Sequence, residues 1–143
     1  MILLDTCVVS ESLKPDPAEA VLRWISVVPE QRVYLSVFVL AELQKGIEKL
    51  DTGRKQAALR IWFEQLQDRF KDRILDFDAE TALAWGRMIA NLEYKGVKLP
   101  LMDSLLAAQA SHRDFILATR NTDDFKASGI QLVNPWEGHQ TPL

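Results

Sequence analysis

The sequence predicts an α/β fold with three layers, in which a central parallel sheet of about four to five strands lies between helices on both faces. Short apolar runs, of the length of buried strands, alternate along the chain with longer segments whose apolar residues recur at helical spacing. Strands separated by helices pair in parallel, and such a sheet is covered on both faces. The length of 143 residues is that of one ordinary domain, so we expect a single domain over residues 1–143.

The first half of the chain contains two predicted strands and two predicted helices. Ile2–Leu4 and residues 32–35 are short apolar runs of the kind found in buried strands. Ser36 follows the second run as a candidate N-cap for an amphipathic helix over residues 37–50. After a turn, helical spacing resumes over residues 54–72, which predicts two antiparallel helices.

The second half of the chain continues this alternation. One helix is expected after the N-cap Asp78 to about Gly96, and a second over residues 101–112 behind Pro100. Three short strands are expected at residues 74–77, 115–118 and 130–133, with a polar turn at residues 119–124.

Acidic residues follow the predicted strands, at the edge of the sheet where open α/β folds bind ligands. Asp5 ends the first strand, and Glu42 lies about two turns into the helix after the second. Asp123 and Asp124 lie in the turn after residues 115–118. Each has an ordinary alternative on its own, since Asp5 could cap the next helix and Glu42 could be a solvated helix residue.

Asp103 stands out because it begins an otherwise largely apolar helix. A buried carboxylate without a partner costs free energy, so this residue requires either a partner or solvent. Capping by the helix dipole is the alternative, and it is worth roughly 0.3 to 1 kcal/mol in the first turn.

Several carboxylates at one edge repel one another, and a divalent cation would relieve this repulsion. Oxygen ligands from Asp and Glu favour Mg²⁺ or Mn²⁺. Such an ion can activate a water for attack on phosphorus, which predicts hydrolysis of phosphodiesters. This chemistry requires no histidine, and we expect His112 and His139 to be surface residues away from the acidic edge.

Composition agrees with an ordinary globular protein, since 48% of residues are hydrophobic and 26% are charged. The single cysteine, Cys7, cannot form an internal disulfide, and no Cys or His cluster has zinc-ligand spacing. The N-terminus lacks the basic stretch of a secretory signal, and no apolar run approaches the ~20 residues of a membrane span. We therefore expect a cytoplasmic protein with no membrane partner.

A set of short motifs, in this order along the chain, resembles the PIN domain, specifically the VapC and FitB-like toxins of type II toxin–antitoxin systems. The motifs are Leu3-Leu4-Asp5-Thr6, Ala41-Glu42-Leu43, Asp103 before small residues, Ala118-Thr119-Arg120-Asn121 before Asp124-Phe125, and Asn134-Pro135-Trp136. The resemblance implies a compact α/β/α fold, an endoribonuclease that needs Mg²⁺ or Mn²⁺, and a homodimer. It also implies inhibition by a small DNA-binding antitoxin whose C-terminal segment lies across the active groove.

Site roles follow from the resemblance position by position. Asp5 and Asp103 would be direct metal ligands, and Glu42 would complete an acidic triad. Asp124 or Asn121 would take the fourth position, with Asp123 as a further candidate. Thr6 and Thr119 would be polar neighbours of the site.

Two residues depart from the family pattern. Cys7 stands where the family usually has Asn, so a hydrogen bond that supports the site is expected to be missing or replaced. Asn121 stands where some members of the wider family have a carboxylate, which shifts the fourth position towards Asp124.

The net charge of −3 means that an RNA substrate would be attracted by a local basic surface rather than by the whole protein. Arg120, within the predicted active turn, could contact RNA, an antitoxin acid or a structural carboxylate. The other candidate phosphate contacts, for which solvated surface charge is the simpler interpretation, are Lys45, Lys49, Arg54, Lys55, Lys95 and Lys98.

The apolar faces of the helices within residues 37–70 are the leading candidate for an antitoxin or dimer surface, with core packing as the alternative. Most of the four tryptophans, Trp24, Trp62, Trp85 and Trp136, are expected in the core.

Other functional classes fit less well. A phosphoacceptor receiver domain would require an acidic pair at the first strand and a lysine after a late strand, and a dinucleotide-binding domain would require a glycine-rich turn after Ile2–Leu4. The remaining alternative is a catalytically inert PIN scaffold that binds RNA or a protein partner. Metal-dependent cleavage, or metal-free RNA binding without turnover, would separate these two hypotheses.

Overall fold

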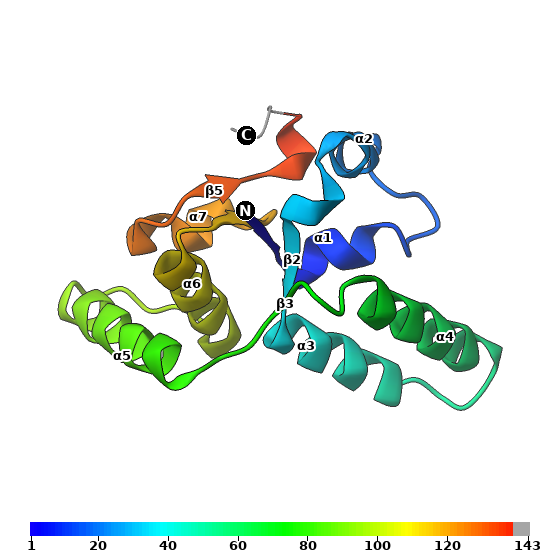
Figure 1. Ribbon diagram of the computed structural model, residues 1–143, viewed down its shortest axis with the longest axis horizontal. Helices are drawn as coiled ribbons and strands as arrows, with labels where there is room; N and C mark the ends of the chain where they lie inside the picture. The colour runs from blue at the N-terminus through cyan, green and yellow to red at the C-terminus, as the bar shows by residue number, and fades with distance from the viewer. Residues whose placement is uncertain (139–143) are drawn as a thin grey trace.

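A five-stranded, fully parallel sheet lies at the centre of the computed structural model, which describes residues 1–138 (Figure 1). The strand order is β3-β2-β1-β4-β5, so β1 is the central strand. The strands are β1 (Ile2–Leu4), β2 (Val33–Ser36), β3 (Ile74–Leu75), β4 (Ile116–Ala118) and β5 (Leu132–Val133). The predicted three-layer α/β/α class is confirmed.

Helices cover both faces of this sheet. They are α1 (Thr6–Glu11), α2 (Glu19–Val27), α3 (Val37–Glu48), α4 (Arg54–Arg69), α5 (Ala79–Tyr94), α6 (Leu101–Arg113) and the one-turn α7 (Thr122–Phe125). Short 3-10 turns are η1 (Glu30–Arg32), η2 (Lys126–Ser128) and η3 (Pro135–Glu137). Figure 1 shows α5 and α6 packed together on the left and the α3–α4 hairpin at the lower right. Within residues 1–138, no helix is long and apolar enough to cross a membrane.

Most predicted elements are present with small differences in length. Helix α4 ends at Arg69 rather than residue 72, because the buried Phe70 turns the chain towards β3. Strands β3 and β5 are only two residues long because they form the edges of the sheet, where each pairs with a single neighbour. Helix α2 was not predicted, and the end of the predicted polar turn 119–124 is helical as α7.

Side chains cap the helices that follow the strands. The hydroxyl of Ser36 accepts a hydrogen bond from the Phe38 amide at 3.0 Å, and Asp78 accepts one from the Thr81 amide at 2.9 Å. Both predicted N-caps are therefore confirmed, and each satisfies an amide that lacks a partner within its helix.

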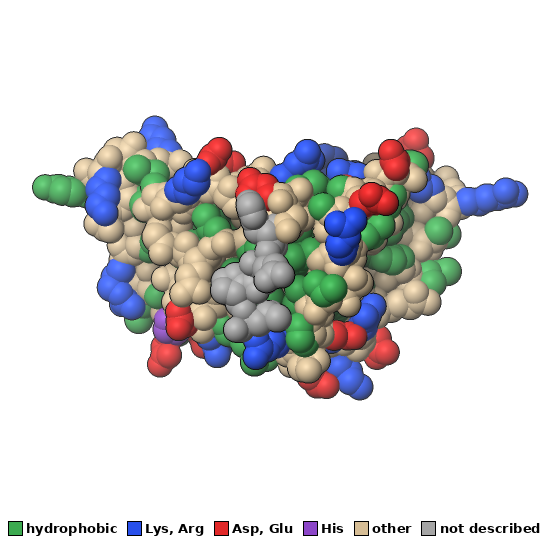
Figure 2. Space-filling view, turned by 90° about the horizontal axis from the view of Figure 1, so that it is seen from above, with side chains coloured by type: hydrophobic (Ala, Val, Ile, Leu, Met, Phe, Trp, Pro, Cys, Tyr) green, Lys and Arg blue, Asp and Glu red, His purple; other side chains and the backbone are tan. Residues whose placement is uncertain are grey.

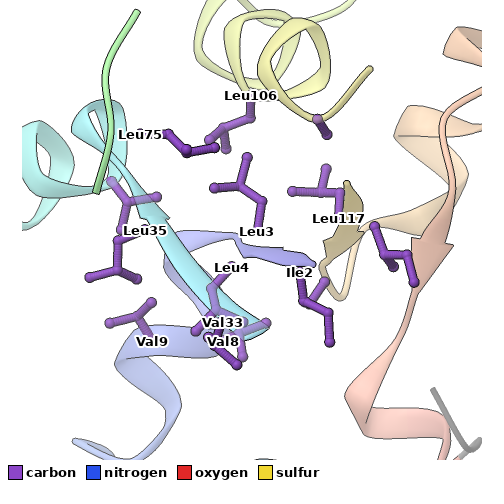
Figure 3. Close-up of a cluster of buried hydrophobic side chains, with 14 of the residues drawn as sticks. Ile2, Leu3, Leu4, Val8, Val9, Val33, Leu35, Leu75, Leu106 and Leu117 are labelled. Carbon is purple, nitrogen blue, oxygen red and sulfur yellow. The ribbon is translucent and has the colours of Figure 1, made fainter. Parts of the chain in front are cut away.

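The core lies on both faces of β1. Leu3 points towards Leu106 of α6, whereas Ile2 and Leu4 point to the opposite face, on the side of Val8 in α1 (Figure 3). Because side chains alternate between the two faces of a strand and both faces are covered, all three residues of β1 are apolar and buried. This burial fixes the position of Asp5, which follows directly.

A buried polar network ties α3 to α6. The Ser36 hydroxyl donates a hydrogen bond to Oε1 of Gln109 at 2.5 Å. The Gln109 amide nitrogen donates to the carbonyl oxygens of Leu75 and Asp76 at 3.2 and 3.3 Å. Because every polar atom of this glutamine amide has a partner, its burial is tolerated. The network sets the relative position of the two helices that carry acidic candidates.

Candidate active site

Asp5 lies at the carboxyl end of β1 and is only 7% exposed. Its backbone amide donates to the carbonyl oxygen of Ala118 at 2.9 Å, which continues the pairing of β1 with β4. Oδ1 accepts a hydrogen bond from the Thr6 amide at 2.8 Å, so Asp5 also caps α1. The capping role and a metal-binding role are compatible because Oδ1 accepts this one hydrogen bond and retains a lone pair for a cation.

The second carboxylate oxygen of Asp5 receives two side-chain donors. Thr119, which is fully buried at the end of β4, donates its hydroxyl to Oδ2 at 2.7 Å. The thiol of Cys7 donates to the same oxygen at 3.6 Å. These donors orient the carboxylate, as is usual for carboxylates that serve as metal ligands.

Glu42 of α3 is linked to the same edge through Thr6. The Thr6 hydroxyl donates to Oε2 of Glu42 at 2.6 Å. Thr6 follows Asp5 directly, so one strand end brings together two of the candidate acids. Both threonines expected to be neighbours of the site, Thr6 and Thr119, are thus bonded to acids within it.

Asp103 occupies the first turn of α6, and its pKa is raised from 3.8 to about 6. The largest cause is burial, which disfavours the charged carboxylate, and the negative charges of Asp5, Asp124 and Glu42 follow in that order. The structure therefore places Asp5, Glu42 and Asp124 close enough for their charges to act on Asp103. Their arrangement calls for a positive charge.

The polar residues of the turn after β4 have different surroundings. Asp124 acts on the pKa of Asp103, whereas the exposed Asp123 forms an ion pair with Lys126. The amide of Asn121 donates to the Thr119 hydroxyl at 3.1 Å, so its backbone supports the site. This geometry favours Asp124 over Asp123 for the fourth acidic position.

Cys7 provides a donor at the position where the family usually has Asn. Burial raises the pKa of its thiol from 9.0 to about 11, and the negative charge of Asp5 adds to this effect. The thiol is therefore protonated at neutral pH and can donate to Asp5. The resemblance raised the question of a missing or replaced hydrogen bond, and in the structure the thiol replaces it.

The raised pKa predicts that Cys7 reacts slowly with iodoacetamide in the folded protein. A pKa of about 11 in place of 9.0 lowers the thiolate fraction, and with it the alkylation rate at pH 8, by about a hundredfold. Mass spectrometry reports this directly, since the chain has one cysteine. The same protein in denaturant is the control, and equal rates in both conditions would contradict the inferred environment.

Other predicted positions lie elsewhere. His112, at the end of α6 opposite to Asp103, faces Glu80 with 3.8 Å between Nε2 and Oε2, and it is exposed as predicted. His139 lies outside the described residues.

The guanidinium carbon of Arg120 lies 5.3 Å from the centre of the Trp136 ring. Within residues 1–138, none of the lysines and arginines predicted as phosphate contacts forms an ion pair with an acid of the site.

The donor set fits a hard divalent cation. All the candidate ligands are carboxylates, and oxygen ligands select Mg²⁺ or Mn²⁺ over softer metals. Within residues 1–138, no three His, Cys, Asp or Glu side chains form a ready-made cage for a metal. Mg²⁺ is commonly held by only one or two carboxylates with several waters, so two direct ligands suffice.

Known proteins share this fold and sequence over nearly the whole chain. The PIN domain family matches residues 2–129. The plasmid stability protein StbB of Pseudomonas syringae pv. tomato is 38% identical, over 96% of this chain and 99% of its own. The toxin FitB of Neisseria gonorrhoeae is 36% identical over 95% and 99% of the two chains. The VapC ribonuclease Y4jK of Sinorhizobium fredii is 33% identical over 96% and 99%.

The crystal structure of FitAcB from Neisseria gonorrhoeae superposes with a TM-score of 0.91 at 36% identity, covering 95% of this chain and 99% of that chain. The family match over residues 2–129 spans the strand ends that carry the acidic residues. The resemblance inferred from the short motifs is thereby confirmed, and the chain belongs to the PIN-domain family, in the group of VapC and FitB-like toxins.

Proposed function

We propose that this protein is a Mg²⁺- or Mn²⁺-dependent endoribonuclease and the toxin component of a VapBC-like toxin–antitoxin system. The observation that carries the proposal is the gathering of acids at the carboxyl edge of a PIN-domain sheet, where Asp5 ends β1 and Thr6 bonds to Glu42. The raised pKa of Asp103, to which burial and then the charges of Asp5, Asp124 and Glu42 contribute, agrees with this arrangement. The ribonuclease activity named for the Sinorhizobium fredii relative supports it. We further propose that residues 1–143 act as one domain in the cytoplasm.

In this proposal Asp5 and Asp103 hold the metal ion, and Glu42 and Asp124 complete the acidic site. When bound, the ion supplies Lewis-acid chemistry that activates water and stabilises charge on phosphate oxygens. Thr119 and Cys7 keep the Asp5 carboxylate oriented, and Thr6 does the same for Glu42. The carboxylates of Glu42 and Asp124 are available to orient a water or to accept its proton.

Cleavage of a mixed RNA pool in EDTA, Mg²⁺ or Mn²⁺ tests this function directly. Purified, antitoxin-free protein should cut RNA with either metal and should be inactive in EDTA. Glu42→Gln should lower the rate by at least about tenfold, because it removes one charge of the acidic site. Glu48→Gln is the matched control, since Glu48 lies on the same helix and is exposed.

Two outcomes would contradict the proposal. Cutting that persists in EDTA, or that is equal in wild type and Glu42→Gln, would show that the activity does not arise from this site. The absence of cutting with any metal, by protein shown to be folded, would support the inert scaffold that binds RNA or a protein partner.

A surface for the proposed antitoxin lies between α2 and α4. A pocket of about 200 Å³ opens there, lined by apolar side chains that include Val9, Ile25, Trp62 and Leu66. Exposed apolar side chains of α2 lie beside it, namely Leu22, Ile25 and Val27. Figure 2 looks onto the side where α2 lies and shows hydrophobic side chains among charged ones on its right half. Such a surface suits an apolar helix of a protein partner.

This surface differs from the one that the sequence predicted. The apolar residues of α3, namely Val39, Leu43 and Ile47, are buried in the core, so the alternative of core packing holds for that helix. Helix α4 contributes Trp62 and Leu66 to the pocket, as expected. The other wall comes from α2, a helix that was not predicted from the sequence.

The homodimer remains part of the proposal. Leu83 and Tyr94 lie on one face of α5 at helical spacing, and they are 65% and 92% exposed. A second copy of the chain is the occupant that we propose for this face, because large exposed apolar side chains are enriched at interfaces.

A further inference from the structure

Arg120 lies in the loop after β4, and its guanidinium group faces an aromatic ring. Its Cζ atom lies 5.3 Å from the centre of the Trp136 ring, which is within the range of a cation–π contact. The charge of Arg120 also acts on Glu11, although the two side chains form no ion pair in the described part of the chain. The Lys14 ammonium and the Ala18 amide hold the pKa of the Glu11 carboxyl below its usual range, and the charge of Arg120 adds to this effect.

Glu11 is held by other partners. It is only 3% exposed, its Oε1 atom accepts a hydrogen bond from the Ala18 amide at 3.0 Å, and its Oε2 atom lies 2.8 Å from Nζ of Lys14. Trp136 belongs to η3, which packs against α2. The contact with Trp136 therefore connects the loop after β4 to η3 and, through η3, to α2.

The backbone of the same residue faces the acidic site. Its N–H lies near the Cys7 thiol and lowers the pKa of that thiol against the larger effect of burial, and its carbonyl oxygen accepts from Nδ2 of Asn134 at 3.5 Å. Thr119, the preceding residue, donates its hydroxyl to Asp5 at 2.7 Å and accepts the Asn121 amide at 3.1 Å. A shift of Arg120 would therefore disturb both side-chain donors of Asp5.

We propose that Arg120 is a positioning residue: its contact with Trp136 holds residues 119–121 so that the Thr119 hydroxyl keeps Asp5 oriented for the metal. This inference rests on the proposed function of the site. Arginine suits the role because its planar guanidinium group stacks on an aromatic ring. Loss of an outer contact that orients a metal ligand typically lowers metal affinity or activity by about 10- to 100-fold.

A direct contact between Arg120 and an RNA phosphate is the competing role, and the two roles differ in salt dependence. Loss of a phosphate contact weakens RNA binding and reduces the slope of log affinity against log salt by about one. Loss of a positioning contact leaves RNA binding in EDTA, and its salt slope, unchanged. The positioning role also requires Trp136, because that ring holds the guanidinium group.

The experiment compares Arg120→Gln, Trp136→Leu and the double variant with wild type. Arg113→Gln is the matched control, since Arg113 is an exposed arginine at the end of α6 opposite to Asp103. Three quantities are measured on folded protein: the Mn²⁺ dissociation constant by calorimetry, the RNA affinity in EDTA over a range of KCl, and the hydrogen-exchange rate of the Asn121 amide. Trp136→Phe and Arg120→Lys are conservative variants for the case in which the first pair fails to fold.

We expect Arg120→Gln and Trp136→Leu each to weaken Mn²⁺ binding by about tenfold or more and to speed exchange at Asn121. The double variant should bind Mn²⁺ no more weakly than the more impaired single variant, because both substitutions break the same contact between Arg120 and Trp136. Trp136→Phe, which retains an aromatic ring, should restore most of the loss, and RNA affinity should be unaffected throughout.

Either of two results would overturn the inference. In the first, folded Trp136→Leu binds Mn²⁺ as tightly as wild type and exchanges the Asn121 amide at the same rate. If Trp136→Leu does not fold, the same result in both conservative variants counts instead. The other is weaker RNA binding with a smaller salt slope in Arg120→Gln alone. If wild type itself neither binds Mn²⁺ nor cleaves RNA, the proposed function fails, and exchange at Asn121 still decides whether Arg120 and Trp136 hold the loop.

Discussion

Asp103→Asn should abolish RNA cleavage and at the same time stabilise the metal-free protein. We expect the cleavage rate to fall about a thousandfold or more, because loss of a metal ligand removes several kcal/mol of stabilisation from the transition state. The free energy of unfolding without metal should rise by roughly 1 kcal/mol at pH 8. Each unit of a raised pKa corresponds to about 1.4 kcal/mol, and solvent screening at this partly exposed carboxyl reduces the gain. The raised pKa of Asp103, about 6, is the source of that gain.

Asp51→Asn is the control for this experiment, since Asp51 is exposed in the turn between α3 and α4. Cleavage assays with Mn²⁺ and urea unfolding in EDTA measure the two effects on the same preparations. Loss of activity together with loss of stability would indicate that Asp103 is a structural residue and would contradict its assignment to the metal site.

The stability of the metal-free protein should fall as pH rises through the titration of Asp103. In the folded protein this carboxyl has a pKa of about 6, above its ordinary value of 3.8. The folded state therefore binds the proton more tightly than the unfolded state, so this contribution is fully present below about pH 4 and is lost as pH passes about 6. Chemical unfolding in EDTA at a series of pH values between 4 and 8 measures the decline.

The difference between wild type and Asp103→Asn isolates this effect from other groups. Glu11, Glu30 and Asp78 have lowered pKa values, so their contributions are lost as pH falls and act in the opposite direction. Saturating Mn²⁺ should remove the decline because it holds the Asp103 carboxylate in its charged form. Parallel pH profiles for wild type and Asp103→Asn in EDTA would contradict the proposed clustering of acids.

The strands could be predicted because each is buried on both faces. A strand such as Ile2–Leu4 must then be apolar throughout, and this requirement leaves a clear pattern in the sequence. The caps could be predicted for a similar reason, since Ser36 and Asp78 satisfy amides within two or three residues. Both signals are local, so they can be read without knowledge of the fold.

Helix α2 does carry a helical period, although no helix was predicted there. Val21 and Trp24 recur at helical spacing and are buried. Ile25 lies on the same side of the helix and lines the pocket proposed for the antitoxin. Helix α7 was missed because four residues are too few to show a period.

The sequence by itself determined the order of the elements, the strand-end positions of Asp5 and Thr119, and the set of acids at one edge of a parallel sheet. These properties depend on near neighbours in the chain and on burial, which the pattern of residue types records. The resemblance to a known family rested on the same short motifs, and the comparisons confirmed it.

Only the tertiary structure decided which side chains meet. It separated Asp124, which acts on Asp103, from Asp123, which pairs with Lys126. It also brought the hydroxyl of Thr119 to Asp5 from the far end of the chain. Hydrogen bonds and charge interactions depend on distances of a few ångströms between atoms, and for residues remote in sequence those distances are set by packing of the whole fold.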